Sequence, residues 1–487
     1  MNLALDRRSV LHGAAAAGAL AQASALGAKT AGTRKRYVNV GVGARPRLFQ
    51  EAIWTTYRDR CELVAICDTN PGRMAETARR AAKAGAPAPR TYLAQDFDRM
   101  LREIRPDVVI VTVPDALHEP YIIRALEAGC DVMTEKPMTT SAAMARNILD
   151  ACNRTGRDVI VTFNYRYSPF RTQIKEMLMA GAIGDILSVD FNWQLDTTHG
   201  ADYFRRWHSR KAISGGLMVH KATHHFDLVN WWLSANPVEV SAQGRRGFYT
   251  PEMAKRMGLS GAHERCQTCP ETAQCGFYLD IAADAGLRAI YYDNEKYDGY
   301  FRDQCVWRPE IDIEDNMNVV VSYDSGARLS YSLNANCAWE GYTIAFNGTK
   351  GRLEHSAIES SYVAGGDMVQ GATEADNVRI RLYPLRGPHR DITPRILPGG
   401  HAGGDPVMLE DLFGNPPPDP TMRAANQLSG AASIAIGIAA NQCFANGGSV
   451  KIAELLPDLA LPLFAPMPDS HGPVPMPPVL ERKQRID

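Results

Sequence analysis

The sequence shows no excess of charge of either sign. Its 487 residues include 53 Lys or Arg and 54 Asp or Glu, giving a formal net charge of −1. No basic run with interleaved aromatic residues occurs beyond the first few residues. Because nucleic-acid binding depends on clustered positive charge, we expect no nucleic-acid partner. The 45% hydrophobic and 22% charged residues are those of an ordinary globular protein.

Long apolar runs are also scarce, with one exception near the start. The arginine pair Arg7-Arg8 is followed by an Ala-rich apolar run and by the small residues Ala23-Ser24-Ala25. This order predicts a twin-arginine (Tat) signal peptide over residues 1–30, and hence a periplasmic or otherwise exported protein. A disordered leader is the alternative. No other segment approaches eighteen unbroken apolar residues, so we predict no membrane insertion after signal cleavage.

A chain of this length exceeds the size of a single hydrophobic core, so at least two domains are expected. The first half alternates apolar strand patterns with helical ones, which predicts a doubly wound parallel sheet. We assign residues 36–160 to a Rossmann domain and 161–456 to an α/β substrate and oligomerisation domain. A Pro-rich tail follows at 457–487.

The first predicted strand ends in Gly41-x-Gly43, and Asp68 ends the second. Glycines there allow a pyrophosphate to approach the backbone, and a carboxylate accepts hydrogen bonds from ribose hydroxyls. The carboxylate also disfavours a 2′-phosphate, so NAD is expected rather than NADP. The motif lacks its third glycine, because Pro46 stands there. A plain strand–helix turn at the glycines, and a helix cap at Asp68, are the alternatives.

Thr134-Glu135-Lys136-Pro137 directly follows another predicted strand. Ligands bind at the carboxyl ends of parallel strands, where a lysine can polarise a substrate oxygen. The alternative is a surface turn in which Glu135 pairs with Lys136 in solvent.

Three of the twelve histidines lie within six positions, in His220-Lys221-Ala222-Thr223-His224-His225-Phe226-Asp227. On a single helix, His220, His224 and Asp227 would share one face, and we interpret that face as a ligand site rather than a solvated surface. A zinc hydrolase is a weaker hypothesis, because Lys221 replaces the Glu of His-Glu-x-x-His.

A polar and aromatic stretch spans residues 199–208, and its composition suits a carbohydrate. Residues 164–166 follow a predicted strand and are expected to line the same pocket. An exposed loop with its aromatic rings in the core is the alternative. The predicted substrate residues are Asn164, Arg166, His199, Tyr203, Arg206, Trp207, His208 and His225.

A Cys-rich insertion is expected at about residues 245–310. Cys266, Cys269, Cys275 and Cys305 suit a structural zinc site, disulfides, free thiols or an iron–sulfur cluster, and these options stay open. Further on, residues 319–323 and 329–333 predict a hairpin, which residues 343–346 and 351–354 extend. Residues 365–422 have the composition of an extended loop, and residues 424–444 predict a helix.

The chain resembles the Gfo/Idh/MocA (glucose–fructose oxidoreductase / inositol dehydrogenase) family. The resemblance rests on Val40-Gly41-Val42-Gly43, Cys67-Asp68-Thr69-Asn70-Pro71, Val111-Thr112-Val113-Pro114-Asp115 with His118, Glu135-Lys136-Pro137, Phe163-Asn164-Tyr165-Arg166-Tyr167 and the His-rich stretch. It implies a Rossmann domain, a C-terminal α/β domain with a large open, mostly antiparallel sheet, and a homo-oligomer such as a dimer or tetramer. It also implies oxidation or reduction of sugars or cyclitols with NAD(P), assisted by Lys136.

The motifs and the resemblance together assign two sets of residues. The predicted catalytic residues are Lys136, His224, His220 and Lys221. The predicted cofactor-binding residues are Gly41, Gly43, Ala44, Arg45, Asp68, Asn70, Arg73, Thr112, Pro114, His118, Glu135 and Lys136. Relatives carry an aspartate where His220 stands, so His220 keeps proton-transfer capacity without a fixed negative charge.

Export constrains the reaction, because the periplasm should supply no nicotinamide pool. We therefore expect an oxidoreductase acting on a sugar, cyclitol or glycoside with tightly bound, internally recycled NAD. The alternative is a redox-neutral NAD-dependent glycosidase that works by oxidation, elimination, addition and reduction. A sugar-binding protein that keeps NAD as a structural relic is a further alternative.

Overall fold

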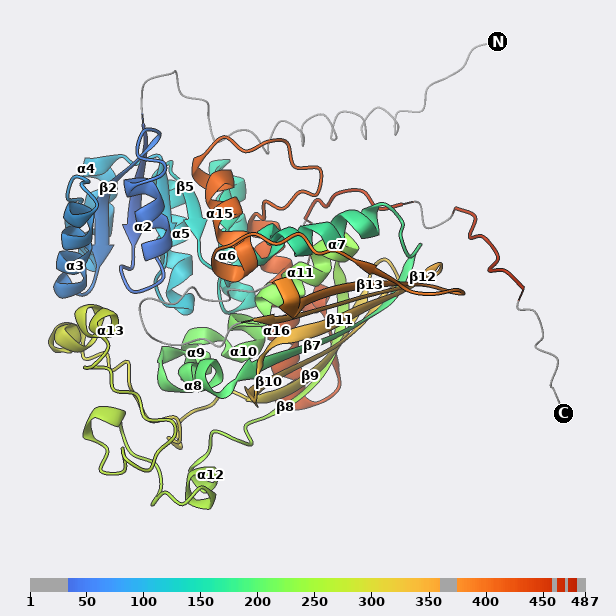
Figure 1. The fold of residues 1–487 in the computed structure, drawn as a ribbon. Helices are drawn as coiled ribbons and strands as arrows, with labels where there is room; N and C mark the ends of the chain where they lie inside the picture. The colour runs from blue at the N-terminus through green and yellow to red at the C-terminus, as the bar shows by residue number, and fades with distance from the viewer. Residues whose placement is uncertain (1–33, 360–374, 458–461, 469–471, 480–487) are drawn as a thin grey trace, which may run out of the picture.

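The computed structural model describes residues 34–359, 375–457, 462–468 and 472–479. The predicted signal peptide at residues 1–30 lies outside these residues, as do parts of the predicted tail. Two sheets organise the described residues, the first built from residues 35–161 and the second from residues 186–451 (Figure 1).

The first sheet has six parallel strands in the order β3-β2-β1-β4-β5-β6. Its strands are β1 (Lys35–Val40), β2 (Cys61–Asp68), β3 (Arg90–Leu93), β4 (Val108–Val111), β5 (Asp131–Thr134) and β6 (Val159–Val161). Successive side chains enter opposite cores: Val38 joins one apolar cluster and Tyr37 the other. Burial on both faces is characteristic of a doubly wound sheet and explains the continuous apolar strands. The Rossmann prediction is confirmed.

Helices connect these strands: α2 (Arg47–Trp54), α3 (Pro71–Lys83), α4 (Phe97–Ile104), α5 (His118–Glu127) and α6 (Ala142–Thr155). Local sequence sets their ends. Asn70 caps α3 by accepting a hydrogen bond from the Arg73 N–H, and Pro71 occupies the first helical position. Ser141 caps α6, which stops at Gly156 in the left-handed conformation.

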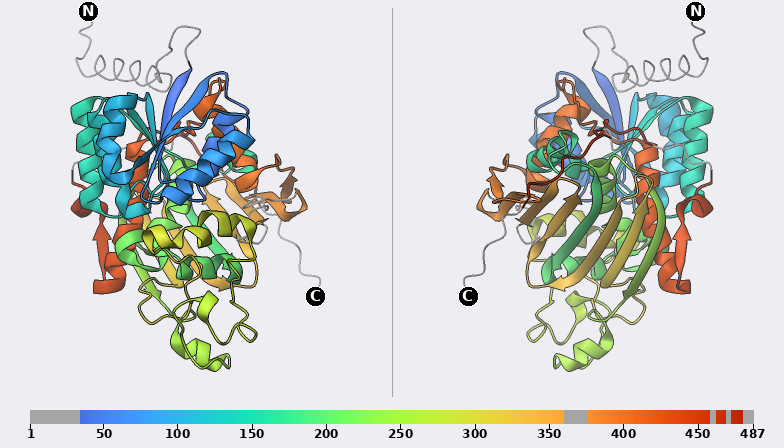
Figure 2. Two further views of the ribbon diagram at one scale, coloured as in Figure 1. Left: turned by 90° about the vertical axis from the view of Figure 1, so that its left-hand side faces the viewer. Right: turned by 90° about the vertical axis from the view of Figure 1, so that its right-hand side faces the viewer.

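The second sheet has nine strands in the order β14-β13-β12-β11-β7-β10-β9-β8-β15. They are β7 (Ile186–Asp196), β8 (Pro237–Arg245), β9 (Asn316–Tyr323), β10 (Arg328–Cys337), β11 (Glu340–Gly348), β12 (Gly351–Glu359), β13 (Val378–Pro384), β14 (Arg390–Ile392) and β15 (Ser449–Lys451). Only the β7–β10 pair is parallel, so the predicted large, mostly antiparallel sheet is confirmed. One face carries the core and the other is open (Figure 2, right), with exposed Leu187, Val320 and Ile358.

The remaining helices are α7 (Pro169–Met179), α8 (Thr197–Arg205), α9 (Lys211–Ser214), α10 (Gly216–His220), α11 (Thr223–Leu233), α12 (Pro251–Arg256), α13 (Ala285–Ile290), α14 (Glu295–Asp298), α15 (Gly400–Phe413), α16 (Gln427–Asn446) and α17 (Ile452–Leu455). Among the described residues, α16 is the one helix long and apolar enough to cross a membrane. However, 67% of its apolar window is buried, against α10, α11 and β8, as in a core helix.

The extended loop predicted over residues 365–422 is wrong for the part that the structure describes. That part forms β13, β14 and α15, although residues 360–374 lie outside the description. Residues 401–403 adopt the left-handed conformation and Pro406 lies inside α15. Both interrupt the helical sequence pattern, so the sequence does not predict this helix. Phe413 of α15 packs edge-on against Tyr37 of β1, with ring centroids 5.3 Å apart, so this segment completes the core of the first domain.

The single helix predicted over residues 220–227 is also wrong, because α10 ends at His220 and α11 begins at Thr223. The regular i to i−4 backbone hydrogen bonds are interrupted between the two helices. The Ala222 N–H donates to the Leu217 carbonyl, five residues back, while the His225 N–H donates to the Ala222 carbonyl, three residues back. Beyond this break the two side chains differ in what they contact: His220 lines a cavity, whereas Asp227 is paired with Arg166 in the core.

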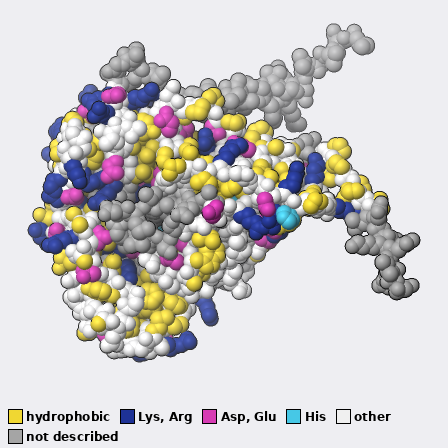
Figure 3. Space-filling model, viewed as in Figure 1, with side chains coloured by type: hydrophobic (Ala, Val, Ile, Leu, Met, Phe, Trp, Pro, Cys, Tyr) yellow, Lys and Arg dark blue, Asp and Glu magenta, His cyan; other side chains and the backbone are white. Residues whose placement is uncertain are grey.

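Acidic and basic side chains are interspersed over the face shown in Figure 3. This mixture matches the balanced charge of the sequence.

Candidate active site

A cavity of about 830 Å³ lies where the two domains meet. The predicted residues that line it are Gly41, Gly43, Ala44, Arg45, Asp68, Arg73, Thr112, Pro114, His118, Glu135, Lys136, His199, Tyr203, Arg206, Trp207, His208, His220, Lys221 and His224. The structure thus brings the predicted cofactor and catalytic residues to one place. Four predicted residues are absent from its wall: Asn70, Asn164, Arg166 and His225.

The glycine loop after β1 is built for close approach of a ligand. Gly41 has φ +81°, and a Cβ there would lie 2.8 Å from backbone atoms of Thr112 and Val113. The Thr112 hydroxyl donates to the Gly41 carbonyl at 2.6 Å and ties the loop to β4. Since no side chain fits at Gly41, the backbone beside α2 stays open, as pyrophosphate binding requires. This cradle fits NAD.

Asp68 lies at the end of β2 and shapes the same loop. Its carboxylate accepts hydrogen bonds from the Val42 N–H at 2.6 Å and the Asn70 N–H at 2.8 Å. Arg73 lies 3.7 Å from the carboxylate. A buried negative charge at this position repels a 2′-phosphate, which supports the preference for NAD.

Lys136 lies at the junction of the two domains. Its Nζ donates to the backbone carbonyl of His220 at 3.1 Å. Burial lowers the pKa of Lys136 to about 8, although the nearby Asp115 and Glu135 oppose this shift. A lysine that titrates near neutral pH can both donate a proton to a substrate oxygen and accept one from it.

Histidines face Lys136 across the cavity. His220 Nδ1 lies 2.5 Å from an oxygen of Asp115, a close hydrogen bond that fixes the ring. His224 stacks on Tyr165 with ring centroids 4.2 Å apart, and His224 Nδ1 has no hydrogen-bond partner among the described residues. Burial, reinforced by Lys136, lowers the pKa of both imidazoles well below the usual range. Both are therefore neutral at pH 7 and able to accept protons.

A chain of hydrogen bonds links the large sheet to the cavity wall. Glu340 of β11 lies 2.7 Å from His199 Nδ1, and His199 Nε2 lies 3.0 Å from the Tyr203 hydroxyl. Arg206 forms an ion pair with Asp202 at 3.0 Å. Trp207 stacks on His208 at 3.6 Å, and both rings line the cavity. This wall offers flat rings and several donors and acceptors, as a polyhydroxylated ligand requires.

Lys221 belongs to the same wall. Its Nζ donates to the Tyr165 hydroxyl at 3.1 Å and lies 5.0 Å from the Trp193 ring centroid. Burial lowers the Lys221 pKa.

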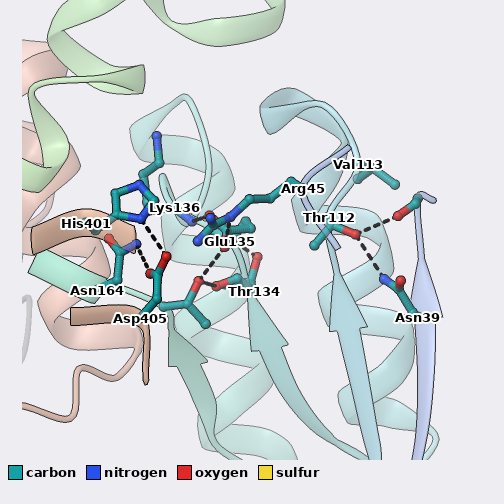
Figure 4. A network of polar contacts seen from close by, with 12 residues as sticks. Asn39, Arg45, Thr112, Val113, Thr134, Glu135, Lys136, Asn164, His401 and Asp405 are labelled. Atoms are coloured by element: carbon teal, nitrogen blue, oxygen red, sulfur yellow. Dashed lines mark hydrogen bonds and ion pairs between the residues drawn. The ribbon is translucent and has the colours of Figure 1, made fainter. Parts of the chain in front are cut away.

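Several predicted residues hold the protein together around the cavity (Figure 4). Arg45 forms an ion pair with Glu135 at 2.7 Å. His118 lines the cavity, but each of its ring nitrogens lies 2.9 Å from a backbone carbonyl. Asn164 donates to Asp405, whose other oxygen lies 2.8 Å from His401 Nδ1. Asn164 therefore faces α15 instead of the cavity.

Two further predicted substrate residues are buried in the core. Arg166 makes a two-pronged ion pair with Asp227 at 2.6 and 2.7 Å, and both side chains are 2% exposed. His225 stacks on Trp193 at 3.9 Å and hydrogen-bonds the Tyr331 hydroxyl. Both side chains are buried in the core, where a substrate cannot reach them.

Sequence reasoning assigned no role to several residues at the cavity. Tyr165 is not one of them, because it was expected to line the pocket and does so. Asp115 had no role but lies within a recognised motif, so its position was available from the sequence. His401, which lines the cavity, lies in the supposed loop, and Glu340 lies in a strand with no motif. Nothing local marks these two residues. They join the site only through sheet pairing and the return of α15.

The four clustered cysteines line a separate small cavity of about 20 Å³. All ten cysteines are free thiols, so the disulfide alternative is wrong. No group of three or more His, Cys, Asp or Glu stands at metal-binding positions within the described ranges, which gives the zinc hypotheses no support. Cys266 accepts a hydrogen bond from Arg205, and burial raises the pKa of Cys269 and Cys305.

Comparison with protein families identifies the chain. Residues 35–163 match the NAD-binding Rossmann fold of the Gfo/Idh/MocA oxidoreductase family. Residues 175–452 match the C-terminal alpha/beta domain of the same family. The protein therefore belongs to the Gfo/Idh/MocA family of NAD(P)-dependent oxidoreductases.

Similar curated proteins agree with this assignment. YteT of Bacillus subtilis, named as an oxidoreductase, is 39% identical over 415 residues, which cover 83% of this chain and 94% of YteT. D-Glucoside 3-dehydrogenase of Escherichia coli is 33% identical over 26% of this chain and 35% of its own length. A glycosyl hydrolase family 109 protein of Shewanella is 25% identical over 41% of this chain and 45% of its own.

Among solved structures, aldose–aldose oxidoreductase from Caulobacter crescentus superposes with a TM-score of 0.57 at 18% identity, covering 86% of this chain and 100% of that protein. At this identity the likeness establishes the shared fold.

Proposed function

We propose that this oxidoreductase acts on a sugar, cyclitol or glycoside, and that it keeps its NAD bound and recycles it in place. The observation that carries this proposal is the position of Lys136 between the two domains. Its Nζ reaches the His220 carbonyl in the same cavity as the glycine loop, so a proton-transfer group and the dinucleotide cradle share one space. D-Glucoside 3-dehydrogenase, among the relatives, supports the substrate class.

When bound, NAD supplies a hydride acceptor. The residues of this chain supply the rest: Lys136 takes the hydroxyl proton, and Tyr203 and Arg206 contact the remaining hydroxyls. Removal of the proton as the oxygen becomes a carbonyl is the step that a lysine of pKa about 8 assists.

The alternative is the redox-neutral glycosidase. It requires a second base that removes a C–H proton beside the new carbonyl. The neutral His224, whose Nδ1 has no partner among the described residues, suits that task. The glycosyl hydrolase family 109 relative supports this alternative.

One experiment separates these proposals. The protein is purified without added nucleotide, and the absorbance near the NADH band is recorded before and after addition of free sugars and then aryl glycosides. A band that rises with a sugar and falls with a second carbonyl substrate would support the oxidoreductase. Release of the aglycone without net change in the band would support the glycosidase. Protein that binds no nucleotide would contradict both.

Export remains a proposal, supported by Arg7-Arg8 and the apolar run that follows. Replacement of both arginines by lysine should keep the protein in the cytoplasm, as measured by cell fractionation. Equal export of the variant and the parent protein would contradict a Tat signal.

We also propose a homo-oligomer, supported by the open face of the nine-stranded sheet with its exposed apolar residues (Figure 2). Light scattering coupled to gel filtration should give a mass of at least twice the monomer.

A further inference from the structure

Residues 285–300 belong to the insertion after β8 and contact the Rossmann domain. Figure 1 shows α13 close to α3, at the edge of the first sheet. This segment contacts the parts of the chain that recognise a dinucleotide: the glycine loop and the start of α3. No family motif predicted a contact between the insertion and this loop.

The contacts are specific. The Ala44 N–H donates to the Tyr291 hydroxyl at 3.2 Å, and a Cβ at Gly43 would lie 3.3 Å from that hydroxyl. The Asn70 amide donates to the Asn294 carbonyl at 3.0 Å. Tyr291 therefore places a phenol beside the loop that faces a pyrophosphate.

Arg73 forms the second contact and is itself nine-tenths buried. Its guanidinium lies 5.5 Å from the Tyr291 ring centroid, 5.8 Å from that of Tyr300, and 2.7 Å from an oxygen of Asp298. Its Nε–H has no hydrogen-bond partner among the described residues. A buried donor without a partner, within a cavity wall, marks a position where a ligand atom is expected.

We propose that residues 285–300 form a clamp over the bound dinucleotide, in which Tyr291, Tyr300 and Asp298 hold Arg73 and close the outer end of the cavity. The clamp contacts the glycine loop and the region of Asp68, where the pyrophosphate and adenosine ribose bind in this fold. The nucleotide then cannot leave until the segment lifts. This inference rests on the proposed function, because it gives the means by which NAD is retained.

The two carboxylates at the clamp also favour NAD over NADP. Asp68 and Asp298 both approach Arg73, at 3.7 and 2.7 Å, so this cation is already paired with two carboxylates. A 2′-phosphate would meet these two carboxylates, with Arg73 already paired to both, whereas ribose hydroxyls would find acceptors.

The test is the rate at which bound NADH leaves, followed by its fluorescence after mixing with excess NAD⁺. The variant Tyr291→Phe/Asp298→Asn removes the phenol O–H and the charge of the carboxylate. We expect release at least about tenfold faster than from the parent protein, since the lost Ala44–Tyr291 hydrogen bond and the lost Arg73–Asp298 ion pair each contribute a factor of several. Weakened contacts lower the barrier to lifting of the segment.

A matched control exists in the same segment. Tyr297→Phe/Asp293→Asn makes the same chemical changes at exposed side chains, and it should leave release unchanged. A second variant acts without altering the clamp residues. Gly72→Ala would place a Cβ 1.8 Å from Asn294 Oδ1 and 2.8 Å from a Tyr297 ring carbon, so the contact of these residues with α3 must shift, and it should also speed release.

The outcomes are distinguishable. If the parent protein holds NADH and all variants release it at the parent rate, the clamp is contradicted while the proposed function stands. If the parent protein binds no NADH, both fail. Faster release from Tyr291→Phe/Asp298→Asn and from Gly72→Ala, but not from the control, supports the clamp.

Discussion

The wall of the cavity and the core directly behind it are built from the same kinds of residue, yet they differ in what those residues contact. On the wall, Lys136 and His224 face a cavity of about 830 Å³, and His224 Nδ1 has no partner among the described residues. Behind the wall, Arg166 is locked in a two-pronged ion pair with Asp227, and His225 is fixed by Tyr331.

This difference shows that residue type and proximity in sequence do not identify a functional group. His224 and His225 are adjacent, and both are buried with a lowered pKa. They differ in whether the ring borders the cavity. Substitutions on the wall should therefore change the rate of the reaction, whereas substitutions behind it should change stability.

The largest effect on rate is expected at Lys136. Lys136→Met removes the proton-transfer group but keeps most of the apolar volume. We expect the rate of NAD reduction by a sugar, measured in a single turnover, to fall about 10²- to 10⁴-fold, the usual contribution of a general acid or base. The thermal midpoint should change little. Lys83→Met on the exposed end of α3 is the control, and a Lys136→Met protein of full activity would contradict our placement of the site.

The largest effect on stability is expected at the buried ion pair. Asp227→Asn leaves the Arg166 charge buried without its counter-ion, which should lower the free energy of unfolding by about 3–5 kcal/mol. The pair Arg381–Asp391 has the same chemistry at the surface, so Asp391→Asn should destabilise the protein far less. Chemical denaturation measures both. Equal losses in the two variants would show that burial does not distinguish them.

A finer comparison uses the adjacent histidines. His224→Gln should slow turnover by about 10²-fold with little loss of stability, since its ring borders the cavity. His225→Gln should instead lose about 1–3 kcal/mol of stability, because it disrupts the hydrogen bond to Tyr331 and the stacking on Trp193. Parallel measurement of single-turnover rates and denaturation midpoints tests both. The reverse pattern would place the wall on the wrong side of α11.

The sequence was sufficient for the first domain because its central strands, such as β4 with the sequence VVIV, are buried on both faces and form continuous apolar runs. The glycine loop, Asp68 and Lys136 follow those strands directly, so local order also predicted their place. The second wall depended on long-range geometry. Whether His225 or His224 faces the cavity depends on the two-residue break after His220. His401 lies on α15, 180 residues beyond Lys221 in the sequence. The spacing of apolar residues along the chain predicts neither the break after His220 nor the position of His401.

The smallest effect, and the most specific to the wall, is the pH dependence of the two half-reactions. Lys136 has a pKa of about 8, so the neutral form that accepts a hydroxyl proton becomes more abundant as pH rises toward 8. Oxidation of the sugar should quicken by up to about tenfold per pH unit below that pKa and level off above it. Reduction of a carbonyl substrate requires the charged form and should slow above the same pH. Rapid-mixing rates in both directions test this, with Lys136→Met as the control. If that variant, at its reduced rate, retains both pH dependences, the titrating group is another residue, and His220 with its partner Asp115 becomes the next to examine.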